Sequence, residues 1–285
     1  MKNPLQSEYL KHFHAEAVEQ FDKAGYLSPV SIISETQANM YRARLEAYEL
    51  ELGHPVQGPL RTKPHLLFKW VDELMRNKTI LDCIEDLIGP NILCWNSWFW
   101  IKEANSPSYV SWHQDSQYWG LDTSKLVTAW LALSPASEAS GCMRVMPGSH
   151  VEEPMIHRDL YNDDNLLTRG QEIVDIDESR AVSMPLQTGE MSFHNIRIAH
   201  ASGPNVSDER RIGLSLHYMP PQTSQLNSDW DCASLVRGVD RYRNFEHAPV
   251  PSCDFDPVTV AYHEKATNAM RELLFKGAEK VRPTI

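Results

Sequence analysis

The 285-residue sequence has few cysteines, no long apolar run and no excess of basic residues. Its five cysteines are widely spaced and form no Cys-x-x-Cys pair, which argues against a disulfide framework and favours reduced, packed thiols. A cysteine zinc site is the alternative interpretation. No apolar stretch approaches the ~18 residues of a membrane-spanning helix, and residues 1–7 show no signal-peptide core. We therefore expect a cytoplasmic protein.

The charge balance narrows the class of partner. Lys and Arg number 27 against 38 Asp and Glu, a net charge of −11, so the basic surface that nucleic acids and anionic membranes require is missing. A small-molecule substrate remains as the expected partner, and the sequence leaves the oligomeric state open. No low-complexity linker divides the chain, so we expect one domain over residues 1–285.

The first 90 residues predict a helical buttress. Apolar spacing predicts one helix capped by Ser7 and ended by Gly25. A second begins at the capping box of Ser34 and Gln37, and a third covers residues 79–88.

Residues 91–220 change to short strands separated by turns. The predicted strands are 91–102, 109–115, 126–133, 142–146, 181–184, 190–194, 197–201 and 210–218. About eight strands without long intervening helices favour a double-stranded β-helix, a jelly roll of the cupin-like kind. Residues 221–285 should wrap onto this core and end in a helix near 258–275. The expected fold class is therefore mainly β, with N-terminal and C-terminal helices flanking the core.

A pair of residues on the second predicted strand could hold a metal. His113 and Asp115 are two residues apart, so in an extended segment both side chains leave the same face. If His200 arrives from another strand, two imidazoles and one carboxylate form the facial arrangement that binds non-haem Fe(II) with positions left open. A second His-x-Asp, His157 and Asp159, precedes a polar stretch typical of a loop. It is the weaker candidate, because metal sites need rigid support.

Arg211 is the next candidate site residue, as a group that could bind an anion near the metal. A turn-forming segment, residues 203–208, separates it from His200, which predicts a hairpin with the two side by side. Alternation along 211–218 puts apolar side chains on one face and Arg211 on the other, toward the metal. A buried arginine is costly unless it meets an anion, and a dicarboxylate co-substrate would supply one. A structural ion pair with an acidic residue is the alternative.

Four motifs follow one another in order along the chain. They are QFDKAGYL at 20–27, WHQD at 112–115, GCMRVMPGSH at 141–150, and HASGPN at 200–205 with RRIGL at 210–214. Together they resemble the phytanoyl-CoA dioxygenase family of Fe(II)/2-oxoglutarate oxygenases, which has a double-stranded β-helix core.

The resemblance implies cofactors and site residues. Fe(II) is the implied metal, with 2-oxoglutarate and O2 as co-substrates. The implied iron ligands are His113, Asp115 and His200, and the implied 2-oxoglutarate contacts are Arg211 and Ser202 at the C5 carboxylate, Asn96 at the C1 carboxylate and Trp130 as a pocket wall. Halogenating relatives carry a small residue in place of the carboxylate ligand, so Asp115 implies a hydroxylase.

The substrate is less defined. Segments expected near the pocket mouth offer Gln117, Tyr118, Trp98, Met146, His194 and Arg197 as substrate contacts, with packing or rim positions as the alternative. We expect hydroxylation of an aliphatic C–H in a small polar or anionic metabolite, with release of succinate and CO2. Two other classes remain: an inactive cupin-like binding protein, and a non-redox metalloenzyme that uses the same His/Asp/His set to activate water.

Overall fold

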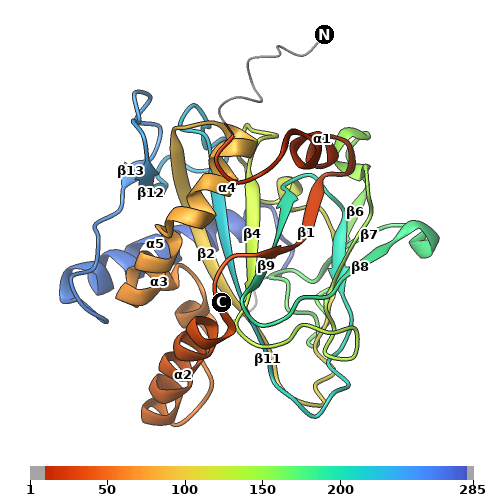
Figure 1. Cartoon of the computed structure of the whole chain (residues 1–285), viewed down its shortest axis with the longest axis horizontal. Coiled ribbons are helices and arrows are strands. Elements are labelled where there is room, and N and C mark those ends of the chain that lie inside the picture. The colour runs from red at the N-terminus through yellow and green to blue at the C-terminus, as the bar shows by residue number, and fades with distance from the viewer. Residues whose placement is uncertain (1–9, 281–285) are drawn as a thin grey trace.

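Two β-sheets face each other in the computed structural model, which describes residues 10–280 (Figure 1). The larger sheet has seven strands in the order β1 (Tyr26–Ser31), β9 (Glu190–Asn195), β4 (Val127–Ala132), β11 (Arg211–Met219), β2 (Ile92–Lys102), β12 (Cys232–Arg237) and β13 (Glu246–His247). Its neighbours are antiparallel except for the parallel pair of β12 and β13. The eight strands expected between residues 91 and 220 are present, with ends shifted by up to three residues.

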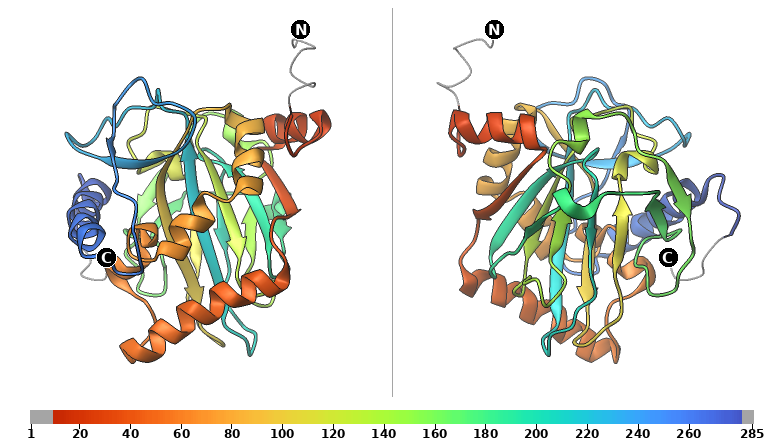
Figure 2. Two further views of the ribbon diagram at one scale, coloured as in Figure 1. Left: turned by 60° about the vertical axis from the view of Figure 1, so that its left-hand side comes forward. Right: turned by 90° about the vertical axis from the view of Figure 1, so that its right-hand side faces the viewer.

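The smaller sheet is antiparallel and closes over the larger one (Figure 2). It contains β3 (Val110–His113), β10 (His200–Ser202), β5 (Met143–Val145) and β8 (Val182–Met184) in that order. A short hairpin of β6 (His157–Asp159) and β7 (Gln171–Ile173) lies beside β3. The facing sheets form the expected jelly-roll core.

The side chains of the central strand β11 point alternately to the two faces of the large sheet. Ile212, Leu214 and Leu216 point outward and are fully buried beneath helices. Arg211 and His217 belong to the opposite set, which points into the space between the sheets. One strand thus contributes both to the main hydrophobic core and to an internal cavity.

Helices cover the outer face of the large sheet (Figure 2, left). They are α1 (Ala15–Ala24), α2 (Glu35–Leu52), α3 (Lys69–Met75) and α4 (Lys78–Ile88). The last helix, α5 (Pro257–Phe275), is not part of this layer and packs near β2 and β12. Short 3-10 turns are η2 (Gly58–Arg61), η3 (Pro64–Leu66), η4 (Asp115–Gln117), η5 (Ser149–Val151) and η6 (Glu178–Arg180). The capping box of Ser34 and Gln37 is present at α2. Between residues 10 and 280, no helix combines the length and the apolar character needed to cross a membrane.

The N-terminal prediction was wrong in part. The proposed cap, Ser7, lies outside the described residues, and α1 begins only at Ala15. The backbone N–H groups of residues 11–13 instead donate to the Asp86 carboxylate on α4, at 2.8 Å each, which holds this segment out of a helix. Strand β1 was also missed, because a bulge between Leu27 and Val30 interrupts its alternation.

The predicted hairpin between His200 and Arg211 was wrong too. Strand β10 pairs with β3 and β5 in the small sheet, whereas β11 pairs with β2 and β4 in the large sheet. The intervening residues 203–210 cross from one sheet to the other. His200 and Arg211 therefore lie on facing sheets, on opposite walls of one cavity.

Candidate functional site

His113, Asp115 and His200 converge between the two sheets. In the pairing of β3 with β10, His200 stands opposite His113, and the two ring centroids are 4.1 Å apart. The Asp115 Oδ1 atom lies 3.3 Å from His113 Nε2. All three residues are buried, and one donor atom of each lies within 4.8 Å of the others. No other trio of His, Cys, Asp or Glu in the described residues has this geometry.

Asp115 reaches this position by a turn and not by strand alternation. Strand β3 ends at His113, and Asp115 is the first residue of η4. The 3-10 turn carries the carboxylate back beside the imidazole two residues earlier. The expectation that both side chains leave one strand was therefore wrong, although the two side chains do lie together.

Backbone hydrogen bonds fix both imidazoles in one tautomer. His113 Nδ1 lies 2.9 Å from the Ser111 carbonyl, and His200 Nδ1 lies 3.0 Å from the Ile198 carbonyl. A carbonyl only accepts, so each Nδ1 carries the proton and each Nε2 presents a lone pair. Such a bond on the far nitrogen is typical of histidines that bind metals. The arrangement fits a divalent cation bound by two Nε2 atoms and one carboxylate.

Burial sets the protonation of the three side chains. It lowers the pKa of His113 and of His200 to about 4, so both imidazoles are neutral at neutral pH. Burial also raises the pKa of Asp115 to about 6. A buried carboxylate beside two neutral imidazoles lacks a counter-charge, and a bound cation would supply it.

Both residues of the second His-x-Asp motif, His157 and Asp159, form contacts outside the metal-binding trio. His157 Nε2 accepts the backbone N–H of Gln114 at 3.0 Å, and Asp159 pairs with Arg169 at 3.4 Å. Strand β6, and not a loop, carries both residues. Neither belongs to a metal-binding trio.

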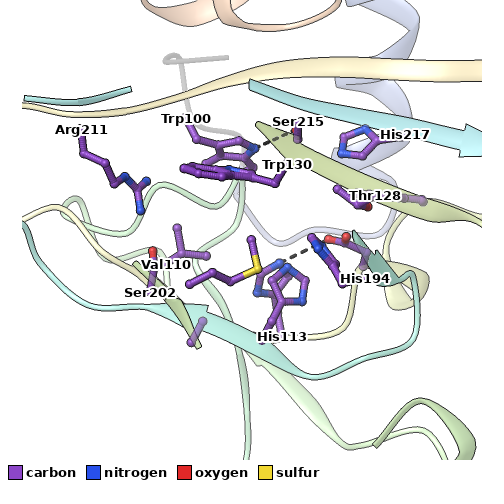
Figure 3. A pocket seen from close by; sticks show the side chains of 15 residues that line it. Trp100, Val110, His113, Thr128, Trp130, His194, Ser202, Arg211, Ser215 and His217 are labelled. Carbon is purple, nitrogen blue, oxygen red and sulfur yellow. Dashed lines mark hydrogen bonds and ion pairs between the residues drawn. The ribbon is translucent and has the colours of Figure 1, made fainter. Parts of the chain in front are cut away.

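Arg211 is a buried cation without an acidic partner. Its Nη1 donates to the Gly141 carbonyl at 2.5 Å, its Nε has no partner, and no carboxylate of the described residues lies within ion-pair distance. Burial lowers the pKa of Arg211 to about 10, which leaves the guanidinium charged at neutral pH. Figure 3 shows the guanidinium pointing into the cavity that also contains the trio. The arrangement disfavours the structural ion-pair alternative and fits an incoming anion.

Lys102 and Ser202 lie beside this guanidinium. Lys102 is the pairing partner of Arg211 on β2, and its Nζ donates to Ser202 Oγ at 2.7 Å. Burial, and then the charge of Arg211, lower the pKa of Lys102 to about 6. A carboxylate bound here would meet the charged guanidinium of Arg211, the amine of Lys102 and the hydroxyl of Ser202, and its negative charge would favour protonation of that amine.

A model of the phytanoyl-CoA dioxygenase (PhyH) family matches residues 21–213. The chain belongs to the phytanoyl-CoA dioxygenase family. This confirms the resemblance carried by the four sequence motifs, which fall within or next to the matched residues.

Individual relatives of this family member agree with the assignment. A probable alpha-ketoglutarate-dependent hypophosphite dioxygenase of Stutzerimonas stutzeri is 32% identical over 159 residues, about half of each chain (54%). The apo structure of a non-heme monooxygenase, ThoJ, has 32% identity and a TM-score of 0.81, covering 91% of this chain and 98% of that one. CytC3 with Fe(II) and alpha-ketoglutarate has 25% identity and a TM-score of 0.60, covering 82% and 92%. These relatives bear out the expected fold class and the expected iron and 2-oxoglutarate cofactors.

Two tryptophans wall the middle of the cavity of this PhyH-family chain (Figure 3). The Trp130 ring lies beside the guanidinium of Arg211, with 5.4 Å from Cζ to the ring centroid. Trp100 Nε1 donates to Ser215 Oγ at 3.0 Å. The Trp130 ring has room because β11 carries Gly213 here, where a Cβ atom would lie only 1.9 Å from Trp130 Cζ2.

The substitution Gly213→Ala should therefore displace the Trp130 ring. We expect a loss of about 1–3 kcal/mol in the free energy of unfolding, as for other overpacked cores, and weaker binding of 2-oxoglutarate beside Arg211. Thermal unfolding and a 2-oxoglutarate titration measure the two effects. The double variant Gly213→Ala/Trp130→Phe should recover stability, and no recovery would place the cause elsewhere.

A second cavity adjoins the first across Asp115, Trp100, Trp119 and His217. It is bounded by β2, by the segment 166–171 and by the end of α5. Three predicted site residues line it, namely Asn96, Trp98 and Tyr118, while Trp130, Ser202 and His194 line the first. The Asn96 Oδ1 atom is buried without a partner, so this amide oxygen can accept a further hydrogen bond, whereas a carboxylate would be bound through the Nδ2 donor.

The structure does not bring the other predicted substrate contacts to either cavity. Gln117 is exposed on η4. Met146 packs with Trp112 on the far side of the small sheet. Arg197 lies in the turn after β9 and donates to the Glu152 carbonyl at 3.0 Å. Each lies beyond the end of an observed strand, where the chain turns away from the cavity. Met146 and Arg197 were expected inside strands 142–146 and 197–201, which are shorter in the structure.

Sequence reasoning missed Lys102, Thr128 and the contribution of α5. Alternation along β2 would have revealed Lys102, since Asn96, Trp98 and Trp100 occupy the same face. The apolar spacing of Met270 and Leu274 on α5 indicates burial but not the surface that covers them, because tertiary packing alone positions this helix.

Proposed function

We propose that this chain is an Fe(II)- and 2-oxoglutarate-dependent dioxygenase that hydroxylates an aliphatic C–H of a small polar or anionic metabolite. One observation carries the proposal. A buried His/His/Asp trio with two free Nε2 lone pairs shares a cavity with a buried, unpaired guanidinium. This is the combination that a metal-chelated oxoacid with a free carboxylate tail requires.

Each residue then has a distinct task. His113, Asp115 and His200 would hold Fe(II) and leave positions open for the oxoacid and O2. Arg211, with Ser202 and Lys102, would bind the C5 carboxylate, and Asn96 the C1 carboxylate. When bound, iron and 2-oxoglutarate supply an oxidative decarboxylation with O2 that yields succinate, CO2 and a hydroxylated substrate. Trp100 and Trp130 keep water from the space between the metal and Arg211.

Asp115 favours hydroxylation over halogenation. Asp115 would give Fe(II) a third protein ligand beside His113 and His200, so a chelating oxoacid and O2 would leave no position for a halide. A chlorinated product from the unmodified enzyme in the presence of chloride would contradict this part of the proposal.

The two other classes have less support. A binding protein without catalysis has no use for open metal positions, and all three candidate ligands are retained here. A hydrolytic zinc enzyme could use the trio, but the unpaired guanidinium of Arg211 would have no task in activating water.

One experiment separates the three classes. Fe(II) and 2-oxoglutarate are added to the protein without oxygen, the visible absorption band of the chelate is recorded, and succinate release is then measured after oxygen is admitted with a metabolite library. The proposal predicts the band and substrate-dependent succinate. A fully iron-loaded protein without the band would refute it.

On acidification, protonation of Asp115 should be the first event that lowers the affinity for iron. Metal binds the deprotonated ligands, so the raised pKa of Asp115, about 6, should cost about tenfold in affinity per pH unit below that value. The lowered pKa of both histidines, about 4, delays their competition to more acidic solutions. Anaerobic Fe(II) titrations across this range measure the slope. Two-proton competition beginning near the ordinary histidine pKa of about 6.5 would contradict the prediction.

A further inference from the structure

A row of polar side chains crosses the inner face of the large sheet near the trio. Strand register places His194 of β9 opposite Thr128 of β4, and Thr128 opposite His217 of β11. His217 in turn pairs with Asn96 of β2. We call His194, Thr128 and His217 the polar row. It begins beside the residue proposed above for the C1 carboxylate.

The polar row has hydrogen-bonding capacity that the protein does not use. His194 Nδ1, Thr128 Oγ1 and His217 Nδ1 are all buried and have no partner within the described residues. Leaving a buried polar group unpaired costs about 1–3 kcal/mol, so three on adjacent strands call for an explanation. A ligand whose oxygen atoms accept hydrogen bonds from all three would provide one.

The polar row also lies in the right place for a reacting molecule. All three side chains line the same cavity as the trio, and the ring centroids of His194 and His200 are 4.9 Å apart. Figure 3 shows Thr128 and His217 at the opposite end from Arg211, with Trp100 and Trp130 between them. The anchor for the tail of 2-oxoglutarate is therefore separate from the polar row.

Buried charge favours a negative ligand. Asp115 is the only carboxylate among the residues that line the two cavities. The charges of Fe(II), Asp115, Arg211 and the 2-oxoglutarate dianion sum to zero. Buried Lys63 adds a further positive charge near the polar row: its Nζ donates to the Trp95 carbonyl at 2.6 Å, and it forms no ion pair with a carboxylate of the described residues. Lys63 lies close enough to His217 that its charge, after burial, helps to lower the pKa of that imidazole to about 3.

We propose that the polar row binds an oxyanionic group of the substrate, such as a carboxylate, and thereby selects small anions over neutral molecules and amines. The inference rests on the proposed function and deepens it by naming the substrate class. The remainder of the substrate would extend into the second cavity, between Trp98 on β2 and the side chains of Met270 and Leu274 on α5. The anionic end would thus hold a nearby C–H beside the metal.

Three probes of similar size and different charge test the inference. Acetate, acetamide and methylammonium are each titrated into the enzyme with Fe(II) and saturating 2-oxoglutarate, without oxygen and at constant ionic strength. Tryptophan fluorescence follows binding, because the Trp119 ring lies 4.7 Å from that of His217. The absorption band of the iron chelate shows whether 2-oxoglutarate stays bound.

The inference predicts that acetate saturates the signal while the band persists, and that acetamide and methylammonium bind at least about tenfold more weakly, as expected for loss of a charged acceptor. Thr128→Val should weaken acetate about tenfold without changing 2-oxoglutarate affinity. Ser192→Ala is the matched control, since Ser192 lies on the same face with an equally unpartnered hydroxyl but does not line the cavity.

Four outcomes would overturn the inference while leaving the oxygenase proposal intact. They are no saturation by acetate, equal or tighter binding of acetamide or methylammonium, an unchanged acetate affinity in a folded Thr128→Val variant, and a loss of 2-oxoglutarate affinity in that variant. The last would assign the polar row to the co-substrate. Absence of the iron chelate band in the unmodified enzyme would instead refute the proposed function itself.

Discussion

Replacing Asp115 with alanine is expected to abolish stable Fe(II) loading and the absorption band of the iron chelate. The substitution removes the one carboxylate that residues 10–280 place with the two imidazoles, where Asp115 Oδ1 lies 3.3 Å from His113 Nε2. Loss of residues that merely support a metal ligand costs about 10–100-fold in affinity, so loss of a ligand should cost more. Anaerobic Fe(II) titration with and without 2-oxoglutarate measures the effect.

The chain provides a matched control in its second His-x-Asp motif. Asp159→Ala removes a carboxylate in the same local sequence pattern, but this one pairs with Arg169 at 3.4 Å and accepts from the Tyr161 hydroxyl at 3.3 Å. We expect a small loss of stability and unchanged iron binding. Equal iron affinity in Asp115→Ala and the unmodified protein would remove the basis of the proposed function.

Local patterns predicted those parts of the fold that depend on neighbours in sequence. The capping box at Ser34 located the start of α2, and alternation along β11 correctly separated Arg211 from Ile212. Alternation works on β11 because its two faces meet different surroundings, a helical layer on one side and a cavity on the other.

Such local patterns do not determine which strands pair over long distances in the sequence. The turn residues between His200 and Arg211 are compatible with a hairpin, and only the competing partners of β10 and β11 place them in different sheets. The α5 wall of the second cavity is similar: Met270 and Leu274 sit in an apolar helix stripe that predicts burial but not what it is buried against.

For Asp115, the sequence correctly predicted that its side chain lies beside His113, but the predicted backbone conformation was wrong. Two-residue spacing suggested a shared strand face, yet the strand ends at His113 and a 3-10 turn carries the carboxylate. Both paths bring side chains two residues apart close together. The spacing therefore predicted the contact without determining the backbone that makes it.

Arg211→Ala should raise the concentration of 2-oxoglutarate required for binding far more than it changes iron affinity. The C5 carboxylate would lose its guanidinium in a buried site, worth about 2–5 kcal/mol or roughly 30- to 5,000-fold. Lys102 should reduce this loss. The charge of Arg211 is one cause of the lowered pKa of Lys102, so removing the guanidinium favours the protonated lysine, which can bind the carboxylate in part. We therefore expect the lower half of this range, measured by titrating the chelate band.

The adjacent arginine is the control that separates binding from folding. Arg210 points away from the cavity, where it pairs with Glu49 at 2.5 Å and with Glu103 at 2.8 Å. Arg210→Ala should lower the thermal unfolding temperature and leave 2-oxoglutarate affinity unchanged, the reverse of the result for Arg211→Ala. If both variants lost stability and co-substrate affinity alike, Arg211 would have a structural role, and the anion site opposite the trio would have to be sought elsewhere in the cavity.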